Sequence, residues 1–265
     1  MAAVSAELLA VVERSPAATD AHDRAAWVGL FAADARVEDP YGSRPHVGTE
    51  EIGRFYDTFI GPREIIFHRG VDVAVGAAVV RDLTLEIVMA AGVTLNVPMH
   101  LRYDLRASDG DWEVERLRAH WELSTMVAQM LRHGAKSLPV SLRLGGVLLR
   151  NQGLGGTAGF VSALRRPGRP EKRCVTTFLE AAVAGDEMAA RRAMSRRAAV
   201  SLGEVDPISV GEFIDSVRNG RWFKMIAAGD TVSASVSTPA GRGVIFCETD
   251  RAAGGIRRIR YFAAT

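Results

Sequence analysis

Residues 29–56, GLFAADARVEDPYGSRPHVGTEEIGRFY, decide how the first half of this 265-residue chain folds. An apolar helix end at Leu30-Phe31 leads into a short strand at Arg36-Val37, and that strand ends at Glu38-Asp39-Pro40. A polar turn follows, and a new helix begins at about Gly48. The pattern therefore places the carboxylate of Asp39 where a strand leaves the protein interior.

A carboxylate at the mouth of an apolar pocket is hard to keep ionised. Because burial disfavours the charged form, the pKa of such a group rises towards the range in which it can accept and return a proton near neutral pH. Asp39 is therefore a candidate general base. The alternative from the local pattern alone is a solvated acid in a turn before a proline, and the pattern does not decide between the two.

The run from Leu30 to Tyr56 resembles the segment that carries the catalytic base of the ketosteroid isomerases. The match comprises the carboxylate and its proline, the Gly-Ser turn, the Gly-Thr helix start and the Phe-Tyr pair. These enzymes belong to the nuclear-transport-factor-like cone-fold superfamily, together with polyketide cyclases, scytalone dehydratase and polyether epoxide hydrolases. The resemblance implies that Asp39 takes and returns a substrate proton, and that Tyr56 is a phenol lining the pocket.

The ketosteroid isomerases also place two hydrogen-bond donors at the oxygen that becomes negative when the substrate loses its proton. Ser15 stands where the resemblance would place a donor tyrosine, and His100 stands where it would place a protonated aspartic acid. Because His100 can donate a proton near pH 7, we expect it to face Asp39 as an acid–base partner suited to dehydration or epoxide opening. The alternative for His100 is a core histidine bonded to a backbone carbonyl.

Further side chains are expected to form the wall of the pocket. Trp121 stands, by the resemblance, at an aromatic position that lines the steroid cavity. Besides Ser15, the other candidates for substrate contact are Trp27, Phe55, Met89 and Met99. Tyr103 lies three residues after His100 and is expected on the opposite face of that strand, so Tyr56 is the favoured phenol.

Hydrophobic periodicity predicts an α+β fold for a first domain, residues 1–123. Helical spacing covers residues 4–15, 21–33 and 50–59, with Thr49 as the N-cap of the third helix. The β-rich runs that follow cover residues 64–67, 71–75, 77–89, 94–107 and 112–121. Three helices before a curved antiparallel sheet correspond to the cone fold that the resemblance implies.

Residues 171–265 repeat this order and predict a second, degenerate cone domain. CVTTFLEAAVAGDEMAARRAM, from Cys174, reads as two helices joined by a turn, and strands are expected at 221–228, 231–237, 242–248 and 255–262. When the halves are aligned, Ser201-Leu202 stand where Glu38-Asp39 stand in the first. Asp206-Pro207 is a displaced base or, as we favour, a turn entering a helix. We expect this domain to be catalytically silent.

Residues 124–170 are predicted to form a basic amphipathic helix and linker between the two domains. No Asp or Glu occurs from Leu123 to Pro170, whereas the same stretch holds seven Lys or Arg residues. Three roles remain open: a structural helix between domains or at a dimer face, a basic surface over residues 123–166 that touches anionic membrane lipid, and a lid over the open end of the cone.

Composition limits the other function classes. The two cysteines give no disulfide framework, and neither a secretory signal nor a run of about 18 apolar residues occurs, so we expect a cytoplasmic protein. The basic segment lacks interleaved aromatic residues, which argues against nucleic-acid binding. His68, His100 and His120 match no established metal-ligand spacing, and we expect neither metal nor cofactor.

Together these features predict a cofactor-free proton-transfer enzyme of the isomerase, dehydratase or epoxide-opening cyclase type. Its substrate would be a hydrophobic polycyclic or polyketide-like small molecule, with Asp39 as general base. The alternative is a non-catalytic sterol- or lipid-binding module that touches a membrane through residues 123–166. Because the cone fold often pairs through its sheet, we expect a homodimer or an internal pairing of the two domains.

Overall fold

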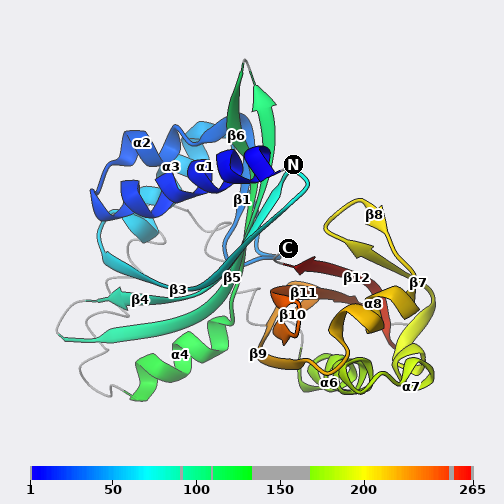
Figure 1. Cartoon of the computed structure of the whole chain (residues 1–265). Helices are drawn as coiled ribbons and strands as arrows, with labels where there is room; N and C mark the ends of the chain where they lie inside the picture. Colours follow the sequence, from blue (N-terminus) through cyan, green and yellow to red (C-terminus); the bar gives the residue numbers. More distant parts are fainter. Residues whose placement is uncertain (1, 90–91, 109, 133–167, 251–253, 264–265) are drawn as a thin grey trace.

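The computed structural model describes residues 2–89, 92–108, 110–132, 168–250 and 254–263, which form two six-stranded sheets with helices (Figure 1). The strand order is β2-β1-β6-β5-β4-β3 in the first sheet and β8-β7-β12-β11-β10-β9 in the second. Strands β7 to β12 thus occupy the same positions in the second sheet as strands β1 to β6 do in the first. The α+β class and the repetition of one topology, both predicted, are confirmed.

The first half carries its helices before and between its strands. In chain order its elements are α1 (Ala2–Asp20), α2 (Arg24–Val28), β1 (Phe31–Glu38), β2 (His46–Val47), α3 (Gly48–Phe55), the π-helix η1 (Tyr56–Ile60), β3 (Glu64–Val75), β4 (Ala78–Val88), β5 (Thr94–Ser108), β6 (Asp111–His120) and α4 (Leu123–Arg132). Helices α1–α3 cover one face of the sheet, and the main apolar core lies between them and that face.

The second half is shorter but follows the same plan. Its elements are α6 (Arg169–Ala184), α7 (Glu187–Arg192), β7 (Met194–Leu202), β8 (Asp206–Pro207), α8 (Val210–Val217), β9 (Arg221–Ala228), β10 (Thr231–Thr238), β11 (Gly241–Thr249) and β12 (Ile256–Ala263). A separate apolar core lies between its helices and one face of its sheet. Strand β7 was not predicted, whereas the four strands from β9 to β12 match the expected runs within one residue at each end.

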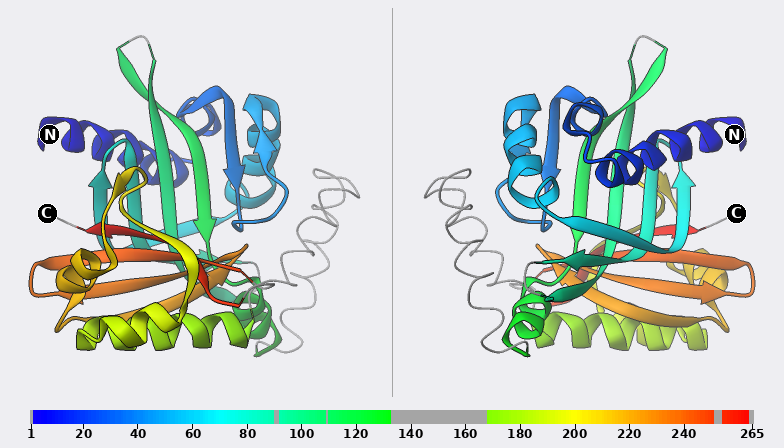
Figure 2. Two further views of the ribbon diagram at one scale, coloured as in Figure 1. Left: turned by 90° about the vertical axis from the view of Figure 1, so that its right-hand side faces the viewer. Right: turned by 90° about the vertical axis from the view of Figure 1, so that its left-hand side faces the viewer.

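The two sheets pack against each other through the faces that their own helices leave uncovered (Figures 1 and 2). A small apolar cluster joins them, with Val73, Ala78 and Val80 from the first half and Val244, Phe246 and Phe262 from the second. The face of the first sheet opposite the α1–α3 helices is therefore covered within one chain, by the second half.

The direction of one strand in each sheet and the end of helix α2 differ from expectation. Each sheet is mixed rather than antiparallel, because β1 runs parallel to β6 and β7 runs parallel to β12. The first of these pairs is joined by more than seventy residues of chain, and a parallel pair needs such a long connection. Helix α2 ends at Val28 and not near residue 33, because Phe31–Glu38 pair with β6, and this tertiary pairing overrides the helical pattern.

The N-cap of the third helix also differs from the prediction. Thr49 lies inside α3, whose N-cap is Val47, and the backbone N–H of Val47 donates to Glu51 at 2.9 Å. The helix is thus capped by a first-turn carboxylate and not by a hydroxyl. The predicted basic helix starts as α4, while residues 133–167 of the predicted linker lie outside the described part of the chain.

Candidate functional site

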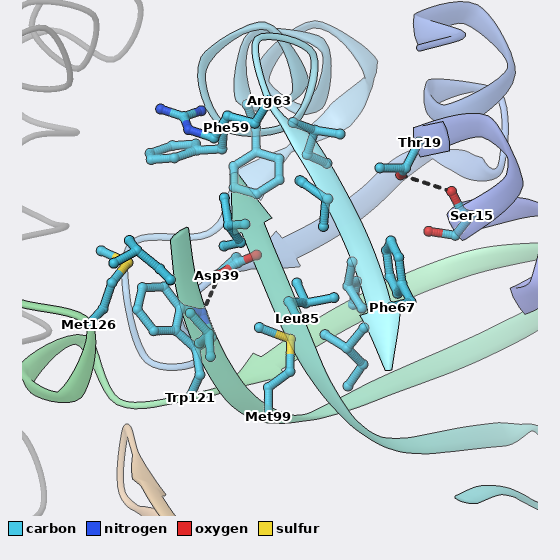
Figure 3. A pocket seen from close by; sticks show the side chains of 18 of the residues that line it. Ser15, Thr19, Asp39, Phe59, Arg63, Phe67, Leu85, Met99, Trp121 and Met126 are labelled. Carbon is cyan, nitrogen blue, oxygen red and sulfur yellow. Dashed lines mark hydrogen bonds between the residues drawn. The ribbon is translucent and has the colours of Figure 1, made fainter. Parts of the chain in front are cut away.

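An apolar cavity lies between the α1 and α3–η1 helices and the inner face of the first sheet (Figure 3). The cavity has a volume of about 130 Å³ and opens to solvent at its mouth. Sixteen of the 21 lining residues are apolar. The other five are Ser15, Thr19, Asp39, Arg63 and Tyr103. So few polar groups in an apolar wall are typical of sites that bind and orient hydrophobic molecules.

Asp39 is placed in this cavity by the end of β1. Strand β1 pairs with β6 as far as Glu38↔Arg118, and the chain then turns at Pro40, which leaves the Asp39 carboxylate inside the cavity. The indole Nε1–H of Trp121, just beyond β6, donates to Asp39 Oδ1 at 2.5 Å. Trp121 therefore holds one carboxylate oxygen and fixes the direction of the other.

The cavity changes the acidity of Asp39. Burial among apolar side chains raises the pKa of its carboxyl from 3.8 to about 6, and the hydrogen bond from Trp121 acts in the opposite direction. A carboxylate with a pKa near 6 is largely ionised at pH 7, and is also a stronger base than a solvated aspartate. These properties suit a group that must both accept and return a proton.

Tyr103 contributes a phenol to the same cavity from β5. Its side chain is fully buried, and Ser15 of α1 lies close to it. Burial raises the pKa of the phenol, while the charge of Arg81 and the neighbouring Ser15 hydroxyl lower it. A phenol with a raised pKa stays protonated at neutral pH, so Tyr103 can donate a hydrogen bond to a ligand oxygen.

The structure brings most of the predicted contact residues to the cavity. Its lining includes Ser15, Trp27, Phe55, Met89, Met99 and Trp121 together with Asp39. Tyr56 is not among the lining residues. It is buried behind the wall against Trp27, with ring centroids 5.5 Å apart, and its hydroxyl has no partner among the described residues. The phenol in the cavity is Tyr103, which strand alternation had set aside.

His100 does not face Asp39, and the expected acid–base pair is wrong. Along β5 the residues Val97, Met99, Leu101 and Tyr103 line the cavity, so His100 points to the opposite face of the sheet. There it is fully buried against the second half, with Nδ1 2.8 Å from Ser233 Oγ and Nε2 2.9 Å from Ser235 Oγ. Burial lowers the pKa of His100 to about 3, so the ring is neutral at pH 7.

The other strand histidines do not gather with His100 into a metal site. His68 is exposed and lies 2.8 Å from Glu86. His120 pairs with His100 across β5 and β6, but it packs between the rings of Tyr41 and Phe246. No group of three His, Cys, Asp or Glu residues suited to a metal ion occurs in the described ranges.

Comparison with known families agrees with this geometry. Residues 7–104 match the family model of the nuclear transport factor 2 (NTF2) domain. This part of the chain is an NTF2-like domain. The matched range contains Asp39, Tyr103 and Ser15 but ends before Trp121.

Several solved structures are similar to part of the chain. A Δ5-3-ketosteroid isomerase from Mycobacterium sp. is 26% identical, with 45% of this chain and 96% of that one covered and a TM-score of 0.41. A Mycobacterium tuberculosis protein in complex with estradiol-17β-hemisuccinate is 24% identical, with the same coverage and TM-score. An M. tuberculosis LEH-like epoxide hydrolase is 17% identical, covers 48% of this chain and 92% of its own, and has a TM-score of 0.42.

The second half repeats the strand order of the NTF2-like domain without its acid. In the first sheet the last paired residue of β1 is Glu38, which lies opposite Arg118 of β6. In the second sheet the equivalent pair is Ser201 of β7 and Arg260 of β12. Leu202 therefore occupies the place of Asp39. Asp206 lies in the two-residue strand β8 and is exposed, and helix α8 begins shortly after it.

None of the helices in the described ranges has the length and hydropathy needed to span a bilayer.

Proposed function

We propose that the NTF2-like domain is a proton-transfer enzyme acting on hydrophobic small molecules, with Asp39 as the general base. The observation that carries this proposal is a carboxylate with a pKa near 6, held by Trp121 in a cavity whose lining is otherwise mostly apolar. The resemblance of the Asp39 segment to the ketosteroid isomerases supports the same role. Because Asp39 itself supplies the base, the proton transfer requires no cofactor.

The arrangement suggests how the transfer proceeds. Asp39 accepts a proton from the carbon next to a carbonyl through the oxygen that Trp121 does not hold, and the C–H bonding electrons move into an enolate. The Tyr103 hydroxyl, which lies near Ser15, donates a hydrogen bond to the enolate oxygen. The protonated Asp39 then returns the proton to another carbon of the conjugated system, which completes an isomerisation.

The same groups suit elimination of water or epoxide opening. In those reactions Asp39 would accept the proton of a carbon or of an attacking hydroxyl, and Tyr103 would donate a hydrogen bond to the leaving or opening oxygen. His100 has no part in any of these schemes, since it lies on the other face of the sheet.

Turnover measurements test the proposal. Purified protein is expected to convert 5-androstene-3,17-dione or a member of a panel of apolar epoxides, with kcat/KM rising as the pH passes about 6. Asp39→Asn should lower turnover at least about a hundredfold while leaving the affinity for an unreactive steroid nearly unchanged. Asp111→Asn, the same change outside the cavity, should behave as wild type. Conversion that survives in Asp39→Asn would contradict the proposal.

A second candidate is a sterol- or lipid-binding module without turnover. It is favoured by the half-exposed apolar residues at the mouth, among them Phe59, Ile65 and Met126, which suit uptake of an apolar ligand. Tight steroid binding that Asp39→Asn does not change, with no conversion of any substrate, would support this function.

The membrane contact suggested for residues 123–166 falls mostly outside the described residues. Co-sedimentation with anionic liposomes, compared with charge reversal at Arg132, tests it.

A further inference from the structure

Among the residues that the structure describes, Arg63 is the only basic one in the lining of the cavity. It lies between η1 and β3, where its backbone N–H donates to Ile60 O at 3.0 Å. Its guanidinium Nη1 donates to Thr58 O at 2.6 Å. The side chain is half-buried, and Figure 3 shows it beside Phe59 at the end of the cavity away from Ser15. The arginine is therefore held at the mouth by the end of the π-helix.

Polarity is divided between the two ends of the cavity. Ser15, Thr19 and Tyr103 are all buried, and Figure 3 shows Ser15 and Thr19 at the end of the cavity away from Arg63. The middle wall is apolar, and the half-exposed rim residues other than Arg63 are apolar as well. A ligand that fills this space meets the neutral groups of Ser15 and Thr19 at one end, Asp39 in the middle and a cation at the other end.

We propose that Arg63 binds an anionic group, a carboxylate or sulfonate-type oxyanion, on a substrate whose body is apolar. This inference rests on the proposed function and adds the substrate class to it. A guanidinium has five N–H donors in a planar fork, so it can hold an oxyanion while it keeps its bond to Thr58. At a half-buried site such a charge-assisted bond is stronger than at an open surface.

The two charges also set the direction in which the ligand enters. An anionic end that entered first would approach ionised Asp39 and lose hydration without gaining a cation. A neutral end that enters first reaches Tyr103 and Asp39, while the anionic end remains with Arg63. The reacting carbon is thus in a part of the molecule that is separated from its charged end.

A matched pair of probes tests this selectivity. N-phenyl-1-naphthylamine and 1-anilinonaphthalene-8-sulfonate share one apolar body and differ by a sulfonate, and both fluoresce on entering an apolar site. We expect each probe to displace the other from the wild-type protein. Arg63→Met should weaken binding of the sulfonate probe by about tenfold and leave the neutral probe within twofold of wild type. Arg63→Lys should give an intermediate loss.

Controls separate this proposal from the proposed function. Arg54→Met removes the same charge from the surface of α3, where Arg54 pairs with Glu50, and should alter neither affinity. Asp39→Asn should abolish proton transfer but retain the preference for the sulfonate that depends on Arg63. An equal loss of both probes in Arg63→Met, no loss of either, or failure of the two probes to compete would overturn the proposal.

Discussion

Asp39 is subject to two interactions that shift its pKa in opposite directions. The apolar surroundings favour the neutral carboxyl, whereas the Trp121 hydrogen bond favours the carboxylate, and the first effect is larger. The ionised form that accepts a proton is therefore the form that destabilises the fold. A residue kept under such conditions is expected to serve function at the expense of stability.

The stability of Asp39→Asn should reveal this conflict. Below about pH 3 the carboxyl is neutral in both the folded and the unfolded protein, so the variant and wild type should be similar. Between the unfolded pKa of 3.8 and the folded value of about 6, the unfolded chain loses its proton first, and wild type loses stability as the pH rises. Above pH 7 the variant should be more stable by up to about 3 kcal/mol.

Urea denaturation at pH 4 and pH 8 measures this difference. Asn keeps the oxygen that accepts from Trp121, so the substitution removes the charge without removing the bond. A variant that is less stable than wild type at pH 8, or a difference that does not change with pH, would show that the carboxylate is not destabilised by its surroundings.

Tyr103 is expected to be the donor that the reaction needs. Tyr103→Phe removes the phenol hydroxyl from the cavity and should lower kcat by about a hundredfold, with a small effect on ligand binding. Tyr56→Phe is the matched control, because its hydroxyl lies behind the wall, and it should retain wild-type kcat. Steady-state kinetics on the best substrate of the panel compares the two. Equal losses in both variants would argue against a role for Tyr103.

The sequence predicted that Asp39 faces an apolar pocket, and the structure places it there. Some of the residues predicted around it also line the cavity, whereas others do not. Asp39, Trp27, Phe55 and Trp121 could be placed because the local pattern and the resemblance fix the ends of β1 and β6. His100 and Tyr103 were exchanged, because alternation shows that they face opposite sides of β5 but not which side is the cavity. That choice depends on the second half, whose serines receive His100.

At the scale of elements, α4 is positioned by contacts at both its ends. Glu122, just before the helix, accepts a hydrogen bond from Ala227 N at 2.8 Å and pairs with Lys172, so it is tied to the second half. Within the helix, Gln129 accepts from Asn96 N at 2.9 Å and donates to Asn96 O at 2.6 Å. These contacts hold Met126 in the cavity wall.

Gln129→Ala should therefore loosen α4 without unfolding the domain. The loss of two hydrogen bonds is expected to speed amide exchange in α4 by about tenfold or more, and to raise the dissociation rate of N-phenyl-1-naphthylamine. Hydrogen–deuterium exchange and stopped-flow fluorescence measure the two effects. Val127→Ala, at an exposed position of the same helix, is the control. Unchanged exchange in Gln129→Ala would mean that other contacts position the helix.

At the scale of the whole molecule, a buried polar cluster joins the two halves. Asp82 of β4 is almost fully buried and accepts from Lys224 Nζ at 2.5 Å and from Ser235 Oγ at 2.8 Å. Because Ser235 donates to Asp82, its oxygen is left to accept from His100 Nε2–H, and Ser233 then donates to Nδ1. The neutral tautomer of His100 is thus defined by residues of the second half.

This cluster explains why His100 could not be assigned from the first half alone. A histidine on a strand of an apolar domain resembles a catalytic group when its partners, more than a hundred residues away, are unknown. The repetition of the fold could be predicted from the order of its elements, but the pairing of particular side chains across two sheets could not.

Breaking the cluster should destabilise the whole chain. Lys224→Met leaves Asp82 buried with less compensation, and should lower the free energy of unfolding by about 3 kcal/mol. The double variant Asp82→Asn, Lys224→Met should lose less than the sum of the two single changes, because no unpaired charge remains. Arg221→Met, at an exposed position on β9, should have little effect. Additive losses in the double variant would show that the pair is not coupled.

If Asp39 accepts a substrate proton, it should exchange that proton for deuterium. 5-androstene-3,17-dione is incubated with the protein in D₂O, and loss of the C4 protons is followed by ¹H NMR. We expect exchange well above the buffer rate with wild type and with Asp111→Asn, and exchange at the buffer rate with Asp39→Asn. Exchange that is as fast with Asp39→Asn as with wild type would contradict this role of Asp39.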